Sequence, residues 1–213
     1  MRTGRFGLVA AERTLRLPGG AGTALRKDGL RQSPVTYLDF TIDGERVHDL
    51  VARCVGHEPD DVSALQDAWP EEAADAVERL LGLGDPDLPD GRTSLYVCPE
   101  CADLGCGALT ALVRLTETTV EWSDLGFQDE NLPGVECVED GAVPLSLQFE
   151  RSGYEEVLRG ELARFQELTV GWVHPRTLER RRRRWKRLSW LKAAFGRPSG
   201  RGPDRSEQPS GRG

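Results

Sequence analysis

Long apolar runs are absent from this sequence of 213 residues. No stretch of 18 or more apolar residues occurs, so no transmembrane helix is expected. Residues 1–11 include basic side chains but no long apolar core, so a secretory signal is not expected either. We therefore expect a soluble, cytoplasmic protein.

Lysine is scarce, and two catalytic signatures are missing. Three lysines stand against 25 arginines, a bias typical of a GC-rich genome, so a run of arginines is weak evidence for function. No Gly-x-Ser-x-Gly nucleophile elbow is present. The glycine-rich residues 19–23 lack the Gly-Lys-Ser/Thr ending of a phosphate-binding loop. Neither signature therefore identifies a catalytic residue.

The net charge of −7 conceals a strong asymmetry along the chain. Residues 176–192 carry nine basic side chains and one acidic one, whereas residues 1–175 carry 15 basic and 32 acidic side chains, a formal charge of −17. Such an acidic body repels nucleic acid and anionic membranes. We therefore expect the body to bind a protein partner with a basic surface, and we expect any polyanion to contact only the C-terminal segment.

Apolar periodicity and turn residues predict the elements of the body. Strands are expected at residues 6–11, 15–17, 35–42, 93–97, 108–115, 119–123 and 145–149, and helices at 47–55, 71–81 and 154–168. Residues 126–143, rich in glycine, proline and acids, are predicted to be a loop. Short connections between the strands favour an α+β fold, with an antiparallel sheet of four or more strands and two or three helices.

Three segments follow from this pattern. Residues 1–175 are predicted to be the α+β domain, which contains a cysteine hairpin, and residues 176–196 a basic amphipathic helix. Residues 197–213 have almost no apolar side chains and are predicted to be a disordered tail. The basic helix could bind a polyanion or a partner through eight consecutive side chains: Arg180, Arg181, Arg182, Arg183, Arg184, Trp185, Lys186 and Arg187. The alternative is that its apolar stripe packs against its own acidic body.

Five cysteines are present, and three of them lie in residues 98–107, between two predicted strands. The odd count, in a chain without an expected secretory signal, favours reduced thiols or metal ligands over disulfides. The turn Cys98-Pro99-Glu100-Cys101 resembles the knuckle of rubredoxin-like and zinc-ribbon sites, in which two thiolates from one tight turn face a metal. Cys106 supplies a third sulfur, so the hairpin predicts a structural zinc site.

The fourth zinc ligand must come from elsewhere in the chain. Cys137 is the candidate that we include in the site, and Asp103, Cys54 and His57 are alternatives. Zinc knuckles usually carry glycine where Ala102 stands, because that residue has a positive φ. Alanine would cost on the order of 1 kcal/mol if that geometry is kept.

Two other interpretations of the hairpin stay open. Its cysteines could be small buried hydrophobic side chains in a tight turn. Alternatively, Cys98 and Cys101 could form the thiol pair of an oxidoreductase. Such pairs usually open a helix within a βαβ unit, whereas here Gly105 and Gly107 lead into a predicted strand.

Several motifs together resemble a family of uncharacterised, mostly actinobacterial proteins. The similarity covers about residues 35–168 and rests on four stretches of sequence: Leu38-Asp39-Phe40, Leu95 to Cys101, Asp103 with Gly105-Cys106-Gly107, and Trp122-Ser123-Asp124. The resemblance implies a bacterial cytoplasmic protein and brings no assigned activity.

Acids and histidines also gather near the first predicted helix. Asp39, Asp43, His48 and Asp49 lie close together in the sequence, but no pairing typical of a metal or acid–base site appears among them. They are predicted to be solvated loop charges.

The function expected from these observations is a non-enzymatic protein-interaction domain of an adaptor, immunity-type or regulatory kind. Two alternatives are retained: a thiol-dependent oxidoreductase that uses Cys98 and Cys101, and a nucleic-acid-associated regulator that binds through residues 180–187.

Overall fold

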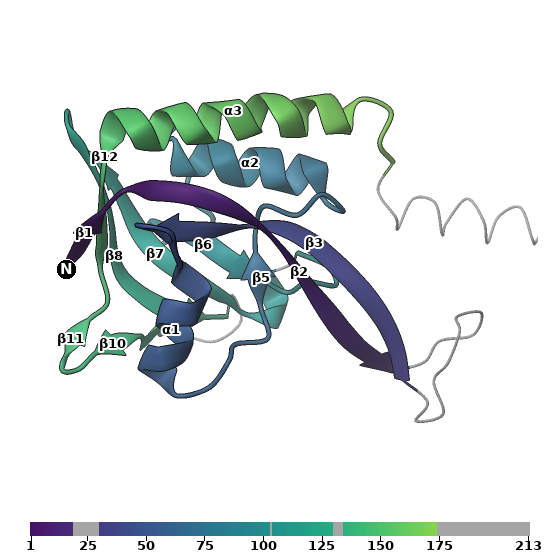
Figure 1. Ribbon diagram of the computed structural model, residues 1–213, viewed down its shortest axis with the longest axis horizontal. Helices are drawn as coiled ribbons and strands as arrows, with labels where there is room; N and C mark the ends of the chain where they lie inside the picture. Colours follow the sequence, from purple (N-terminus) through teal and green to yellow (C-terminus); the bar gives the residue numbers. More distant parts are fainter. Residues whose placement is uncertain (19–29, 103, 130–133, 174–213) are drawn as a thin grey trace, which may run out of the picture. The chain divides into compact units, whose positions relative to one another are not determined.

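The structure is a computed structural model that describes residues 1–18, 30–102, 104–129 and 134–173 (Figure 1). Met1–Trp172 form one compact unit. The predicted basic helix, with Arg180 to Arg187, and the predicted disordered tail lie outside the described residues. No helix within these ranges is long and apolar enough to cross a membrane.

A seven-stranded sheet forms the centre of the unit, with the order β1-β12-β8-β7-β6-β5 and with β9 paired to β8. Its strands are β1 (Arg2–Gly4), β5 (Val62–Ser63), β6 (Arg92–Val97), β7 (Ala108–Leu115), β8 (Thr119–Gln128), β9 (Glu136–Cys137) and β12 (Leu147–Glu150). All neighbours are antiparallel except β1 and β12, which pair in parallel. The α+β class with an antiparallel sheet is therefore confirmed.

A second sheet contains β2 (Phe6–Pro18), β3 (Leu30–Ile42) and β4 (Glu45–Arg46). Residues 6–11 and 15–17, predicted as two strands, belong to the single strand β2. The reason is that β2 pairs with β3 along its whole length, from Phe6 opposite Ile42 to Pro18 opposite Leu30. Backbone pairing therefore carries the strand through a polar stretch that has no strand pattern of its own.

The segment 126–143, predicted to be a loop, contains the end of β8, all of β9, and the small hairpin of β10 (Glu139–Asp140) and β11 (Val143–Pro144). Gly126 explains part of the difference. An added Cβ there would meet the side chain of Val135 and lie 2.8 Å from the carbonyl oxygen of Glu136. Glycine at this position therefore lets β9 approach β8, although in the sequence it counts as a loop residue.

Three helices complete the fold: α1 (Val47–Val55), α2 (Pro70–Leu80) and α3 (Arg151–Thr169). Figure 1 shows α2 and α3 side by side over one side of the central sheet, whereas α1 contacts β3, β4 and β10. The bounds of α1 equal the prediction, because Gly56 ends the helix with φ 79° and donates its N–H to the carbonyl of Ala52.

The core is built around fully buried aromatic side chains. Trp122 on β8 makes edge-on contacts with Phe40 and Phe149, with ring centroids 5.1 Å apart in both pairs. Its indole N–H donates to the hydroxyl of Tyr154, which donates to the carbonyl of Leu80. Strand and helix layers are thereby joined without leaving the polar ends of the rings unsatisfied.

Candidate metal centre

The hairpin between β6 and β7 spans residues 98–107 and carries three of the cysteines. Val97 pairs with Ala108 across the antiparallel ladder, which fixes both ends of the connection. The N–H of Ala102 donates to the carbonyl of Cys98 at 2.9 Å and closes the first turn. A short 3-10 helix, Leu104–Cys106, then leads back toward β7.

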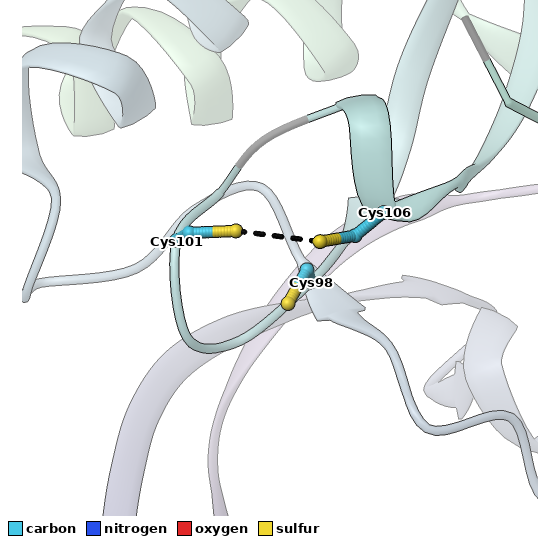
Figure 2. A group of neighbouring side chains, drawn as sticks. All are labelled: Cys98, Cys101 and Cys106. Carbon is cyan, nitrogen blue, oxygen red and sulfur yellow. Dashed lines mark hydrogen bonds between the residues drawn. The ribbon is translucent and has the colours of Figure 1, made fainter. Parts of the chain in front are cut away.

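The hairpin brings three sulfur atoms together. The Sγ atoms of Cys98, Cys101 and Cys106 all lie within 4.8 Å of one another. Figure 2 shows the side chains of Cys101 and Cys106 pointing toward each other, and their sulfurs are 3.6 Å apart. Three thiolates at this spacing can ligate one metal ion, and soft thiolate ligands favour zinc among the common divalent ions.

Ala102 has φ 52°, the left-handed conformation that the zinc-knuckle comparison requires. Alanine rarely takes this conformation because its Cβ crowds the backbone, at a cost of about 1 kcal/mol relative to glycine. The hairpin therefore keeps the knuckle geometry even without glycine. Gly107, with φ 88°, then allows the chain to turn into β7.

The other predicted ligands are not in the three-sulfur group. Cys137 is exposed on β9 and, together with Cys54 and His57, lines a separate cavity of about 500 Å³. Asp103 lies outside the described residues. Among the residues that the structure describes, the group of metal-ligating side chains therefore contains three members, and Cys137 stays a prediction as the fourth ligand.

Four acidic side chains line the cavity that contains Cys137. We name it the acidic cavity: it is lined by Asp60, Asp61, Glu136 and Glu139 as well as by the cysteines and His57. A neighbouring cavity of about 570 Å³ is lined by Cys106 and shares Asp61 and Glu136 with it. The two cavities therefore extend from the cysteine hairpin to α1 along β9.

Burial perturbs two groups that line the acidic cavity. Burial raises the pKa of the Asp61 carboxyl to about 6, an effect that the Arg13 guanidinium opposes and the Asp60 carboxylate reinforces. Burial also raises the pKa of the Cys54 thiol, so this cysteine lacks the depressed pKa of a nucleophile.

Two of the residues predicted to be solvated loop charges are buried instead. Asp39 has no exposed surface and pairs with Arg46, and His48 is 3% exposed, with Nε2 lying 3.2 Å from the carbonyl oxygen of Pro59. The prediction was wrong for these two because it relied on their polarity and on the absence of a recognisable metal or acid–base pairing. Asp39 lies within β3, and His48 points inward from α1.

No protein-family model, curated protein or solved structure matches the chain. The resemblance described from the cysteine motif therefore stays an interpretation of the sequence.

Proposed function

We propose that this protein is a non-enzymatic protein-interaction domain, of an adaptor, immunity-type or regulatory kind, whose cysteine hairpin holds a structural zinc ion. The observation that carries the proposal is the group formed by Cys98, Cys101 and Cys106, whose sulfurs lie within 4.8 Å of one another. Zinc at such a site stabilises the fold, because its binding free energy becomes part of the folding free energy.

The charge around the hairpin supports a metal over a catalytic nucleophile. Residues 98–107 contain the acids Glu100 and Asp103 and no basic side chain. A reactive thiolate usually needs a nearby cation or a helix N-terminus to lower its pKa, and the Cys98 turn opens no α-helix. A divalent cation supplies the positive charge that stabilises the three thiolates. Reduced, metal-bound thiols also suit the cytoplasmic location that is part of this proposal.

Elemental analysis of protein purified without chelator tests the zinc site. We expect about one equivalent of zinc, and we expect Cys101→Ser to release it and to lower the melting temperature. Cys54→Ser is the matched control, since Cys54 is half-buried on α1 and is not in the sulfur group, so it should retain the metal. Loss of the metal from Cys54→Ser would instead identify Cys54 as the fourth ligand. Less than about 0.2 equivalents in the unaltered protein would overturn the proposal.

A further variant addresses the fourth ligand. If Cys137 completes the site, Cys137→Ser removes a ligand and should weaken zinc binding by more than the roughly 10- to 100-fold that the loss of a hydrogen-bonding partner of a ligand costs. If Asp103 completes it, Asp103→Asn should have that effect and Cys137→Ser should leave the affinity unchanged. Titration against a zinc-sensitive chelator measures both.

The acidic cavity supports the choice of a basic protein as the partner. Glu136 and Glu139 are exposed there, and neither forms an ion pair with another described residue. Carboxylates of this kind keep their charge available for a partner and steer association with basic surfaces.

The oxidoreductase alternative has one observation in its favour, the 3.6 Å separation of the Cys101 and Cys106 sulfurs. It requires a thiol with a depressed pKa, which titration with iodoacetamide against pH measures. The nucleic-acid alternative rests on residues 180–187 and requires retention on heparin that is lost when residues 176–213 are deleted.

A further inference from the structure

The pair of cysteines whose sulfurs are in contact is Cys101 and Cys106, and not Cys98 and Cys101 of the Cys-Pro-Glu-Cys motif. Cys101 and Cys106 have their Sγ atoms 3.6 Å apart, and Figure 2 shows the two side chains directed at each other. The Cβ–Sγ bond of Cys98 is directed away from the line that joins them in that view. The sequence spacing alone would have favoured a Cys98–Cys101 pair.

The hairpin is built so that these two sulfurs can approach further. A disulfide has an S–S length of about 2.05 Å, so the sulfurs must move about 1.6 Å closer. Cys106 is exposed and lies between two glycines, whose missing side chains leave its backbone free of Cβ crowding on both sides. Both β6 and β7 are held by the sheet, so only the turn needs to adjust.

We propose that Cys101 and Cys106 are an oxidation site at which a hydroperoxide forms an intramolecular disulfide when the metal is absent. This deepens the proposed zinc site, since it makes that site redox-sensitive. The disulfide removes two of the three sulfur ligands, so the oxidised hairpin no longer holds zinc. Conversely, zinc engages both sulfurs and slows their oxidation, because a metal-bound thiolate is less available as a nucleophile.

The chemistry balances with hydrogen peroxide as the two-electron oxidant. The exposed Cys106 thiolate attacks one peroxide oxygen, the O–O bond breaks, and the products are a sulfenic acid at Cys106 and one water after proton uptake. The Cys101 thiolate then attacks the sulfenic sulfur, the S–O bond breaks, and a second water leaves. Two thiols are oxidised to one disulfide while one peroxide is reduced to two waters, and Cys98 stays a thiol.

Mass spectrometry of the full-length protein tests the linkage. All three cysteines lie between Arg92 and Arg114 on one tryptic peptide, so a second cleavage before Asp103 is needed to separate Cys106 from the other two. Metal-free protein treated with hydrogen peroxide should lose about 2 Da in this peptide, and Cys98 should be the only one of the three that iodoacetamide still alkylates.

Three variants decide which pair reacts. Cys98→Ser should still show the loss of about 2 Da, whereas Cys101→Ser and Cys106→Ser should not. A Cys98–Cys101 disulfide, or retention of the mass loss in Cys106→Ser, would overturn the assignment. A stable sulfinic acid at Cys106 instead of a disulfide would also overturn it, because Cys101 would then have failed to reach the sulfenic sulfur.

The effect of zinc on the oxidation is measured in a separate experiment. Zinc-loaded protein should form the disulfide more slowly than metal-free protein, and peroxide should release zinc in step with the disulfide. Equal rates with and without bound zinc would overturn the coupling. If the protein binds no zinc, the proposed function fails, yet the linkage experiment on the metal-free protein still decides whether the oxidation site exists.

Discussion

The carboxylate of Asp39 accepts a hydrogen bond of 2.6 Å from the hydroxyl of Tyr96, and neither side chain is more than 1% exposed. Asp39 also pairs with the guanidinium of Arg46 at 2.6 Å, and Arg46 donates to the hydroxyl of Tyr37. Because Asp39 lies on β3 and Tyr96 on β6, this network joins the two sheets. Burial, with the nearby Asp39 carboxylate, raises the pKa of Tyr96 well above its ordinary value.

Tyr96→Phe should lower the free energy of unfolding by about 1.5–3 kcal/mol, because it removes a hydrogen bond to a buried carboxylate. Tyr37→Phe is the matched control. It also deletes one phenol hydroxyl, but that hydroxyl accepts from the partly exposed Arg46, so the expected loss is about 0.5–1.5 kcal/mol. Urea denaturation measures both, and a loss for Tyr37→Phe that equals or exceeds that for Tyr96→Phe would contradict the prediction.

The network also shows what the sequence leaves undecided. A polar residue in an apolar strand is expected on the exposed face unless a buried partner is known. The partners of Asp39 are Arg46, seven residues away, and Tyr96, 57 residues away. Tyr96 reaches Asp39 only because the two sheets pack against each other, and no local sequence pattern contains that information.

Local patterns were sufficient where local chemistry determines the structure. Helix α1 and strand β7 have the predicted bounds, because an apolar pattern and a neighbouring glycine define each of them within a few residues: Gly56 follows α1, and Gly107 precedes β7. The strand β9 was missed, since its two residues become a strand only by pairing with β8 at Gly126. The candidate site divides in the same way. The three hairpin cysteines come together locally, whereas the position of Cys137 depends on the path of a distant segment.

Ala102→Gly should stabilise the protein. At φ 52° alanine is strained, and glycine should recover about 0.5–1 kcal/mol. Ala142→Gly is the control, because Ala142 is exposed and is not among the described non-glycine residues with positive φ, so the same change there should be neutral or destabilising. The midpoint of thermal unfolding measures both, and a lower midpoint for Ala102→Gly than for Ala142→Gly would show that the turn is not strained.

The contribution of Asp61 to the free energy of unfolding should fall as the pH rises from about 4 to about 6. Burial raises its pKa to about 6 in the folded chain, whereas an unfolded aspartate has a pKa of about 3.9. Between these values the folded state binds more protons than the unfolded state, so raising the pH favours unfolding. Above pH 6, folding therefore carries the cost of a buried charge.

Asp61→Asn should accordingly raise the urea midpoint at pH 7.5 and leave it nearly unchanged at pH 4. Asp60→Asn makes the same change of charge at the adjacent, fully exposed side chain and should not reproduce this pattern. Equal effects of Asp61→Asn at both pH values would mean that the carboxyl has an ordinary pKa in the folded protein.

The acidic cavity should bind a basic ligand, with Glu136 and Glu139 as its most available charges. A fluorescent peptide of eight arginines serves as the probe, with binding measured by fluorescence anisotropy. Glu136→Gln with Glu139→Gln should weaken binding more than Asp75→Asn with Asp85→Asn. The second pair removes the same two charges from exposed positions outside the cavity. Equal weakening by the two pairs would show that only net charge matters.

Salt and the basic segment provide the second arm of this experiment. The Debye length falls from about 10 Å at 0.1 M salt to about 3 Å at 1 M, so binding of the arginine peptide should largely vanish over that range. Deleting residues 176–213 removes ten net positive charges, so the truncated protein should bind the peptide more tightly than the full chain at low salt. Weaker binding after truncation, or affinity for a peptide of eight glutamates that depends on Arg180 to Arg187, would contradict the acidic cavity as the binding surface. In that case the basic segment, acting on a polyanion, would take its place.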